Sequence, residues 1–415
     1  MLELLYYLTR CAIYGNEPSD YMEKFGNVKV DWDTLFKVAT DNNLISVIYS
    51  VILKINSEHT VLTDEQMQWI LDGAKGTLLH ELQKYYMIRR LVKASEQKGI
   101  KFVFFKGIIL ADLYPQYVER VSSDSDIYVD AKDLSLAEDI LREYGYVLDP
   151  QESKDNVKVY YHDNSKHMVE LHTKLWEDYK GPRIDILESF CLTDGIITQK
   201  ACGMDVYTLG YENHLIYQLF HIIKHFSLEG IGARYLVDIA LFVNNYIDNI
   251  NVESFWDKIS KLGYTKFVNV FFSICIKYLD MDKAIMSGHQ ILSDKRIKSL
   301  MDDLLKVGCA TDKEARWQIM GAMEAYFTGE EKVSKTSLGK KLQMAFPSVK
   351  AMPKVYIYAK RHPILLPFAW IHRDIKFLFK KMAHKDDFYG VGEKMDVAEK
   401  RLSLLDELGL AINDK

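Results

Sequence analysis

Two aspartates, Asp124 and Asp126, lie two residues apart in the chain. The segment 126–130 has the alternating apolar pattern of a strand, so both carboxylates would project from one face of it. Two carboxylates so close together repel each other unless a cation lies between them. Mg²⁺ is the usual cation when a triphosphate supplies further oxygen ligands. The pair therefore predicts a site for one or two metal ions.

A third carboxylate, Glu170, lies in the later alternating segment 167–172. Its neighbours Val169 and Leu171 would face the opposite, buried side of that strand. Each piece has a plainer reading, because Asp-x-Asp pairs also occur in turns and Glu170 with His172 would fit an exposed strand face. The order of the pieces is more specific: a strand, a glycine turn, a short helix, a strand carrying Asp-x-Asp and a later strand carrying Glu.

The elements that must position these side chains form a small α/β unit between residues 100 and 180. Apolar runs and alternation predict strands, and amphipathic spacing predicts a helix at 131–144 that ends at Gly145. The predicted strands are 102–105, 126–130, 157–161 and 167–172. Helical spacing marks 63–99 before this unit, and a long proline-free stretch after Pro182 predicts packed helices.

These motifs resemble the uncharacterised bacterial nucleotidyltransferase family, a branch of the DNA polymerase β-like superfamily. The strong resemblance covers about 75 residues and a more diffuse one runs from His214 to Asp238. The matching pieces are Lys106-Gly107, Leu113-Tyr114-Pro115, Arg120, Ser123-Asp124-Ser-Asp126, Gly145-Tyr146 and Glu170-Leu-His172.

The resemblance implies an α+β fold in which a small mixed sheet with flanking helices lies between helical regions. It divides the chain into four parts. These are an N-terminal helical region at 1–99, a catalytic core at 100–208, a helical domain at 209–335 and a basic, aromatic, helical C-terminal region at 336–415.

The resemblance also implies an activity. Asp124, Asp126 and Glu170 would be catalytic and would bind Mg²⁺ or Mn²⁺. A nucleoside monophosphate would pass from an NTP, with ATP as the default donor, to a hydroxyl of a small molecule, protein or RNA, and pyrophosphate would leave. The residues expected to bind the nucleotide are Lys106, Gly107, Arg120, Ser123, His172, Lys224 and Arg234.

Several of these roles have alternatives. Many superfamily members place a serine after the turn glycine, but Ile108 stands there, so Lys106 either neutralises phosphate or is structural. Arg120 either contacts phosphate or braces the Asp-x-Asp strand, and we favour bracing. Arg234 could instead form an i,i+4 pair with Asp238.

Two other site chemistries and one other function class were considered. His221 and His225 have zinc-ligand spacing, but no third ligand is evident. Asp124-Ser-Asp126 could be the metal motif of a glycosyltransferase, but the helical first hundred residues leave no room for its larger domain. A nucleotide-binding regulator or antitoxin-like protein with little catalysis is the main alternative, and retention of all three carboxylates argues against it.

Charge is divided unevenly along the chain. The net charge is −5, yet residues 340–381 hold ten basic residues and one acidic residue. That region could contact an anionic lipid, nucleic acid or acceptor, or be a helical subdomain with solvated lysines. Five widely spaced cysteines disfavour a disulfide framework. With no signal peptide and no apolar run long enough to span a bilayer, we expect a cytoplasmic protein.

Overall fold

The computed structural model describes most of the chain from the N-terminus to Val307 and several later pieces. The described ranges are 1–177, 181–228, 230–307, 346–352, 356–383 and 402–410, with Ser334, Thr336, 338–339 and 342–343. Cys309, Lys340, Lys341 and Lys354 lie outside them, so the prediction for the basic region 340–381 is only partly covered. No helix in the described ranges is long and apolar enough to cross a membrane.

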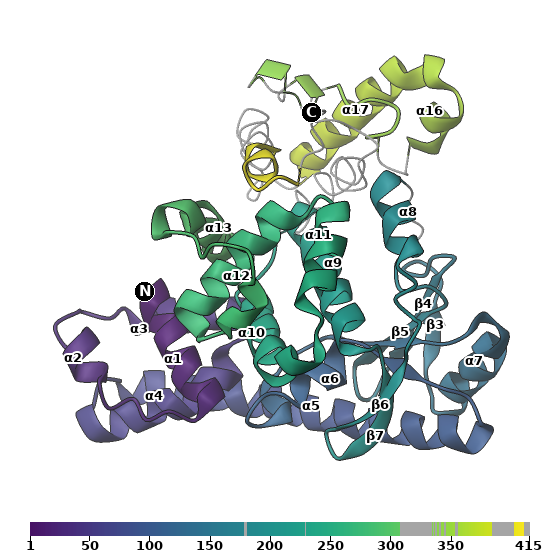
Figure 1. The fold of residues 1–415 in the computed structure, drawn as a ribbon. Coiled ribbons are helices and arrows are strands. Elements are labelled where there is room, and N and C mark those ends of the chain that lie inside the picture. The colour runs from purple at the N-terminus through teal and green to yellow at the C-terminus, as the bar shows by residue number, and fades with distance from the viewer. Residues whose placement is uncertain are drawn as a thin grey trace.

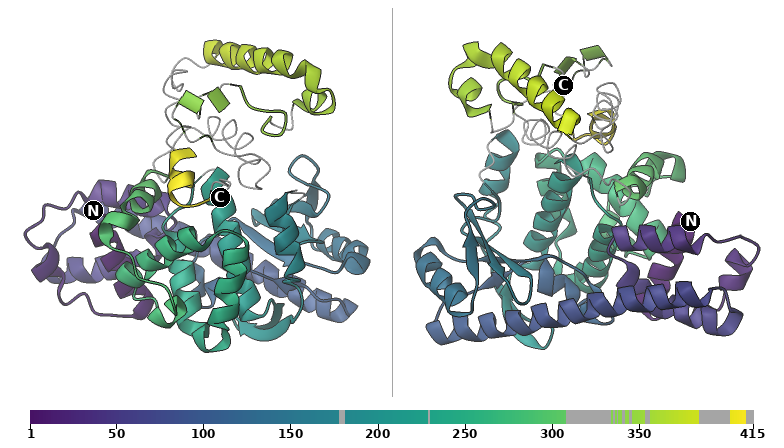
Figure 2. Two further views of the ribbon diagram at one scale, coloured as in Figure 1. Left: turned by 45° about the horizontal axis from the view of Figure 1, so that its top comes forward. Right: turned by 180° about the vertical axis from the view of Figure 1, so that it is seen from behind.

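The N-terminal helices lead into one long helix, α5. They are α1 (Leu2–Tyr14), α2 (Tyr21–Phe25), α3 (Trp32–Asp41) and α4 (Ile45–His59), and α5 spans Asp64–Lys98. Thr63 and Gln66 form a capping box that fixes the start of α5. The left-handed Gly99 ends this helix. Figure 2 shows α5 running along the base of the molecule from the N-terminal helices to the sheet.

A seven-stranded mixed sheet follows, in the order β3-β4-β5-β2-β1-β7-β6. Its strands are β1 (Val103–Phe104), β2 (Asp124–Tyr128), β3 (Val147–Asp149), β4 (Val157–His162), β5 (His167–His172), β6 (Ile197–Ala201) and β7 (Met204–Thr208). β2 lies at the centre, antiparallel to β1 and parallel to β5. Short helices α6 (Gly107–Ala111), α7 (Leu134–Glu143) and α8 (Pro182–Ser189) connect the strands (Figure 1).

The two faces of the sheet meet different surroundings. Ile127, Val169 and Leu171 point away from the carboxylates and share a buried cluster with Ile88 and Leu91 of α5. The carboxylate face meets α9 (Tyr211–Leu228), which begins a second helical group with α10 (Arg234–Tyr246), α11 (Val252–Lys261), α12 (Thr265–Leu279) and α13 (Asp294–Val307). The second half of α5 and α7 therefore support the sheet from behind, and α9 covers the site.

The later helical group and the N-terminal helices share one hydrophobic core. Leu402, Leu405, Leu408 and Leu410 belong to the same core, although they lie near the end of the chain. α16 (Ile357–Arg361) and α17 (Leu366–Ala383) have a small cluster of their own around Met352, Tyr356, Ala359 and Ala369.

The structure confirms the predicted α+β class with a mixed sheet and flanking helices. The helix at 63–99, the amphipathic helix after Asp133 and the strands near 103, 126, 157 and 167 are all present. β3, β6 and β7 were not predicted. β3 has three residues and no alternating pattern of its own. β6 and β7 alternate in burial and form a hairpin around Cys202 and Gly203, so a local signal for them was present in the sequence.

Candidate active site

The central pair of parallel strands brings the predicted carboxylates together. Asp126 of β2 lies directly beside Glu170 of β5 in the strand register. Side chains alternate along both strands, so Asp124 and Asp126 share one face with Glu170 and His172. Val169 and Leu171 occupy the other, buried face, as the alternation predicts. The carboxylates are therefore held by backbone pairing at the centre of the sheet.

Asp126, Glu170 and His172 form the tightest group on this face. Their ligand atoms all lie within 4.8 Å of one another. His172 Nε2 is 3.3 Å from Asp126 Oδ1 and 3.5 Å from Glu170 Oε2. Asp126 and His172 are buried, whereas the Glu170 side chain is 29% exposed. Asp124 lies next along β2, is partly exposed, and is not part of this three-residue group.

Lys106 projects its ammonium over the carboxylates from the turn after β1. Its Nζ lies 2.9 Å from Asp126 Oδ1 and 3.3 Å from the nearer ring nitrogen of His221. Its backbone has φ 64° and ψ −131°, a costly conformation for a residue other than glycine. The Lys106 backbone N–H donates to His214 Nε2 at 3.1 Å. Strain of this kind persists only where surrounding contacts enforce it, and it is typical of functional sites.

Charge interactions within the site shift several pKa values. Burial alone would raise the pKa of Asp126, but Lys106 and His172 outweigh it and hold this pKa at about 2. Burial and the nearby Asp126 raise the pKa of Asp124. Burial would lower the pKa of His172, yet its contacts with Asp126 and Glu170 raise it. The site thus keeps Asp126 ionised and places cationic groups around it.

The loop that leads into β2 is fixed by a buried ion pair from α5. Glu81 and Lys84 contact each other and are both almost fully buried. Lys84 Nζ donates to the Ser122 carbonyl at 3.0 Å and to its Oγ at 2.8 Å, and Glu81 accepts from the Ser122 backbone N–H. The next residues, Ser123 and Asp124, therefore start from a fixed backbone position. Ser123 itself is exposed.

Arg120 is held by a second buried network. Its Nε and Nη2 donate to the two carboxylate oxygens of Asp238 at 2.8 and 2.9 Å. Tyr114 and Arg234 also donate to Asp238, at 2.8 and 3.1 Å. Arg120 Nη1 contacts the Gly107 carbonyl at 3.4 Å. This geometry favours bracing over phosphate binding for Arg120, and it shows the i,i+4 pairing considered for Arg234.

Lys224 belongs to α9, the helix that covers the carboxylate face of the sheet. Its Nζ donates to Glu177 Oε1 at 2.7 Å, and Glu177 also contacts Lys154. A cavity of about 20 Å³ lies between the carboxylate face and α9. The residues that line it include Lys106, Asp126, Glu170, His172, Trp176, Glu177, Tyr217, His221 and Lys224. That space suits about one water molecule, so a nucleotide needs side chains to move apart.

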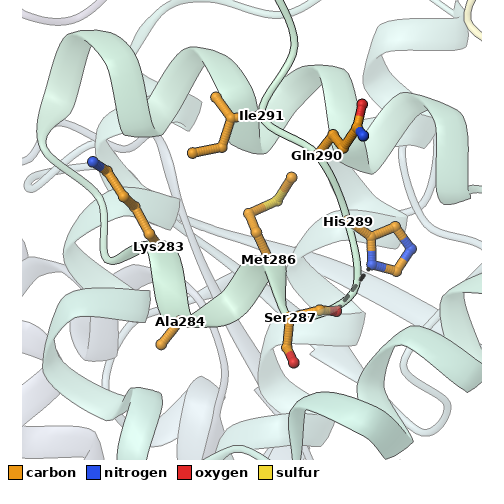
Figure 3. Close-up of a pocket in the computed structure, with 7 residues that line it drawn as sticks. All are labelled: Lys283, Ala284, Met286, Ser287, His289, Gln290 and Ile291. Atoms are coloured by element: carbon orange, nitrogen blue, oxygen red, sulfur yellow. Dashed lines mark hydrogen bonds between the residues drawn. The ribbon is translucent and has the colours of Figure 1, made fainter.

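A larger hollow lies elsewhere and has no such chemistry. It measures about 730 Å³ and lies around Lys283–Met286 and the segment that follows. Figure 3 shows Lys283 and His289 on opposite sides of it rather than converging. The carboxylate face therefore remains the candidate active site.

The two histidines on α9, His221 and His225, are not part of a group with metal-ligand geometry among the described residues. The rings of His221 and His225 lie 4.3 Å apart, and His221 faces Lys106. Burial and the charge of Lys106 lower the pKa of His221 well below its usual range. Among the described residues, the one group with metal-ligand geometry is Asp126, Glu170 and His172.

The comparison with protein families shows the class of this protein. Residues 28–280 match the model of a family described as uncharacterised nucleotidyltransferase. The chain belongs to this family. It is therefore a nucleotidyltransferase, and the matched range includes every predicted site residue.

Comparison with curated proteins finds no match. Among solved structures, the chain is similar to the solution structure of the antibiotic-resistance factor ANT(2'')-Ia. The two are 12% identical, and the similarity covers 43% of this chain and 93% of that one with a TM-score of 0.32.

Sequence reasoning missed the residues that act from outside the sheet. Glu81, Lys84 and Glu177 were not among the predicted site residues. For the first two a signal was present, because an acid and a base three residues apart lie on the apolar side of α5. Glu177 carries no such local signal, since its partners lie on distant segments.

Proposed function

We propose that this nucleotidyltransferase moves a nucleoside monophosphate, with AMP as the default group, from an NTP to a hydroxyl of its acceptor. One observation carries the proposal: Asp126 and Glu170 lie side by side on paired parallel strands, with Asp124 on the same face. Three carboxylates on one face are suited to divalent cations such as Mg²⁺ or Mn²⁺. The buried His172 Nε2 has no hydrogen-bond partner of good geometry among the described residues and lies 3.3 Å from Asp126 Oδ1, which also fits a bound cation.

The proposed reaction breaks a phosphoanhydride bond of the NTP and forms a phosphoester bond to the acceptor. The acceptor oxygen forms a bond to the α-phosphorus, the bond from that phosphorus to the β-bridging oxygen breaks, and pyrophosphate leaves. The acceptor proton passes to a carboxylate, for which the partly exposed Glu170 is best placed. When bound, the metal supplies charge neutralisation for the triphosphate and lowers the pKa of an oxygen ligand.

Lys106 has two tasks in this proposal. Without a nucleotide its ammonium offsets the charge of Asp126. When a triphosphate enters, the same flexible side chain can turn to a phosphate oxygen, because lysine acts as a mobile point charge. The backbone N–H groups of Ile109 and Leu110 already donate to the Lys106 carbonyl, so a backbone donor to phosphate in this turn would be Gly107 or Ile108.

The narrow cavity indicates where the site must open. Lys224 and Glu177 contact each other across it from α9 and from the segment after β5. We propose that Lys224 exchanges Glu177 for the nucleotide's phosphates. Ser123 is exposed beside Asp124 and remains a proposed nucleotide contact.

The test is transfer from an α-labelled NTP, with the full chain, Mn²⁺ or Mg²⁺, and pools of small hydroxyl compounds, RNA or protein. We expect label on one acceptor class and pyrophosphate release, both lost in Asp126→Asn and in Glu170→Gln. Asp130→Asn, which removes an exposed carboxylate just beyond β2, is the matched control. Nucleotide binding without transfer to any pool would favour the regulatory alternative, and absence of binding would overturn both.

Three further expectations remain proposals. The first is the division of the chain into four regions with boundaries after residues 99, 208 and 335. A cytoplasmic location is the second. The third is contact between the basic region 340–381 and an anionic partner, for which the sequence charge is the support.

A further inference from the structure

We propose that His172 is a direct metal ligand, so that the ion held with Asp126 and Glu170 has a nitrogen donor and the site prefers Mn²⁺ and similar transition ions to Mg²⁺. The inference rests on the proposed function, because it concerns the same site. It changes the expected ligand set: the sequence predicted three carboxylates as metal ligands and His172 as a nucleotide contact.

The first support is an unsatisfied buried nitrogen beside a buried carboxylate. His172 Nε2 lies 3.3 Å from Asp126 Oδ1, and within the described part of the chain it has no hydrogen-bond partner of good geometry. Asp126 Oδ1 is paired with the Lys106 ammonium at 2.9 Å, which in the proposed function turns to the triphosphate. Asp126 and His172 are both more than nine-tenths buried. A buried nitrogen without a partner costs free energy unless something else satisfies it. A cation bound to His172 Nε2 and Asp126 Oδ1 would do so.

The second support is the orientation of the imidazole. His172 Nδ1 lies 3.2 Å from the Lys174 carbonyl oxygen. A carbonyl can only accept, so Nδ1 must carry the hydrogen. In the neutral ring Nε2 then has a free lone pair, and it points at Asp126 and Glu170. An Nδ1–H bond to a backbone carbonyl is the usual way to orient a metal-binding histidine.

The third support is that the ring cannot easily turn away. Phe105 packs edge-on against it with ring centroids 5.2 Å apart. β5 also fixes the backbone of His172 beside Tyr128. Glu170 and His172 therefore present an oxygen and a nitrogen two residues apart on one strand, opposite the Asp126 oxygen.

The donor set selects the class of ion. Mg²⁺ favours oxygen ligands in an octahedral arrangement and keeps several waters. Imidazole nitrogen favours later first-row ions, and carboxylates suit Mn²⁺ as well as Mg²⁺. Two carboxylates with one imidazole therefore favour Mn²⁺, Co²⁺ or Zn²⁺ over Mg²⁺.

Pulsed electron paramagnetic resonance tests the ligand directly. We expect Mn²⁺ bound to the full chain without nucleotide to show ¹⁴N coupling, which changes to the ¹⁵N pattern when only histidine is ¹⁵N-labelled. His172→Gln should lose the coupling and weaken Mn²⁺ binding by about tenfold or more. His289→Gln, at the separate hollow around Lys283–Met286, is the control and should keep both. Mg²⁺ should displace Mn²⁺ only at a concentration at least about tenfold higher.

The labelled wild-type protein answers the question even if a variant does not fold. Absence of Mn²⁺ binding, absence of histidine nitrogen coupling, or coupling that persists in His172→Gln would each overturn the inference. Its failure is distinct from failure of the proposed function. Transfer activity without nitrogen coupling would overturn only the ligand assignment, and nitrogen coupling without transfer would overturn only the activity.

Discussion

Lys106 combines a costly backbone conformation with a buried charge, and both are explained by what surrounds it. His214 accepts from its backbone N–H, and Asp126 pairs with its ammonium. Burial would lower the pKa of Lys106, but the carboxylates Asp126, Asp124 and Glu170 raise it. A permanently charged lysine held next to carboxylates can serve a triphosphate without first gaining a proton.

Replacing Lys106 with methionine should weaken triphosphate binding. Loss of one charge-assisted contact costs about 1.5–3 kcal/mol, so we expect a loss of roughly tenfold to a hundredfold in affinity. The measurement is titration with a fluorescent ATP analogue at saturating Mn²⁺. Lys101→Met removes an exposed charge near the same strand and should bind normally. Equal affinities for both variants would show that Lys106 is structural.

His167 lies in β5 but points away from the site. Its Nδ1 hydrogen-bonds with Tyr146 at 2.7 Å and its Nε2 with Ser125 at 2.9 Å. Burial, with the charge of Lys84, lowers its pKa to about 3. The unfolded chain therefore binds this proton more readily than the folded chain between about pH 3 and 6.5.

The free energy of unfolding should accordingly fall as the pH drops below 6.5, by up to about 1.4 kcal/mol per pH unit from this group. His167→Gln should show a flatter dependence in urea unfolding at pH 5 to 7. The comparison between the two proteins is needed because burial raises the pKa of Glu119 to about 7, which acts in the opposite direction. Parallel curves would contradict the prediction.

At the scale of elements, two helices fix the loop between α6 and β2. α5 contributes Glu81 and Lys84, and α10 contributes Asp238. In the loop, Ser122 binds Lys84 of α5 and Arg120 binds Asp238 of α10. The Asp-x-Asp strand is thus placed by a helix that comes before it in the sequence and a helix that comes more than a hundred residues later.

Replacing Arg120 with methionine should destabilise the fold by about 3 kcal/mol, because it leaves Asp238 buried with only part of its pairing. Arg234 still contacts Asp238, so we expect a loss at the low end of the usual range for a broken buried pair. Urea unfolding measures this decrease in the free energy of unfolding. Arg142→Met breaks an exposed pair with Asp139 and should leave the unfolding midpoint unchanged. An Arg120 variant as stable as wild type would show that the network is dispensable.

At the scale of the whole molecule, the end of the described chain returns to the main core. Leu402, Leu405 and Leu408 are buried there with residues of the N-terminal helices. Arg183 of α8 donates to the Leu410 carbonyl at 2.8 Å. α16 and α17, by contrast, form a separate small cluster. The predicted C-terminal region 336–415 thus holds two kinds of packing.

Leu405→Ala should lower the free energy of unfolding by about 2–5 kcal/mol, because it opens a cavity in the shared core. Ile364→Ala is a matched control, since that side chain is 85% exposed. Thermal unfolding of the two variants measures the difference. A single transition that shifts only for Leu405→Ala is expected, and equal melting temperatures would show that this segment is dispensable.

Local patterns were sufficient for the helix α5, for four of the seven strands of the sheet and for the carboxylates. Alternation placed Asp124 and Asp126 on one strand and Glu170 on another, and helical spacing predicted α5, because these features depend on residues a few positions apart. The motif order was also specific enough to indicate the family that the comparison later showed.

Tertiary structure decided which side chains meet. Sequence spacing did not show that Lys106 would lie over Asp126, that His172 would turn its Nε2 towards the carboxylates, or that Arg120 would be paired with Asp238. Each of these contacts joins different segments of the chain. Their partners are chosen by strand register and by packing of α9 and α10, and these depend on the whole core rather than on any local pattern.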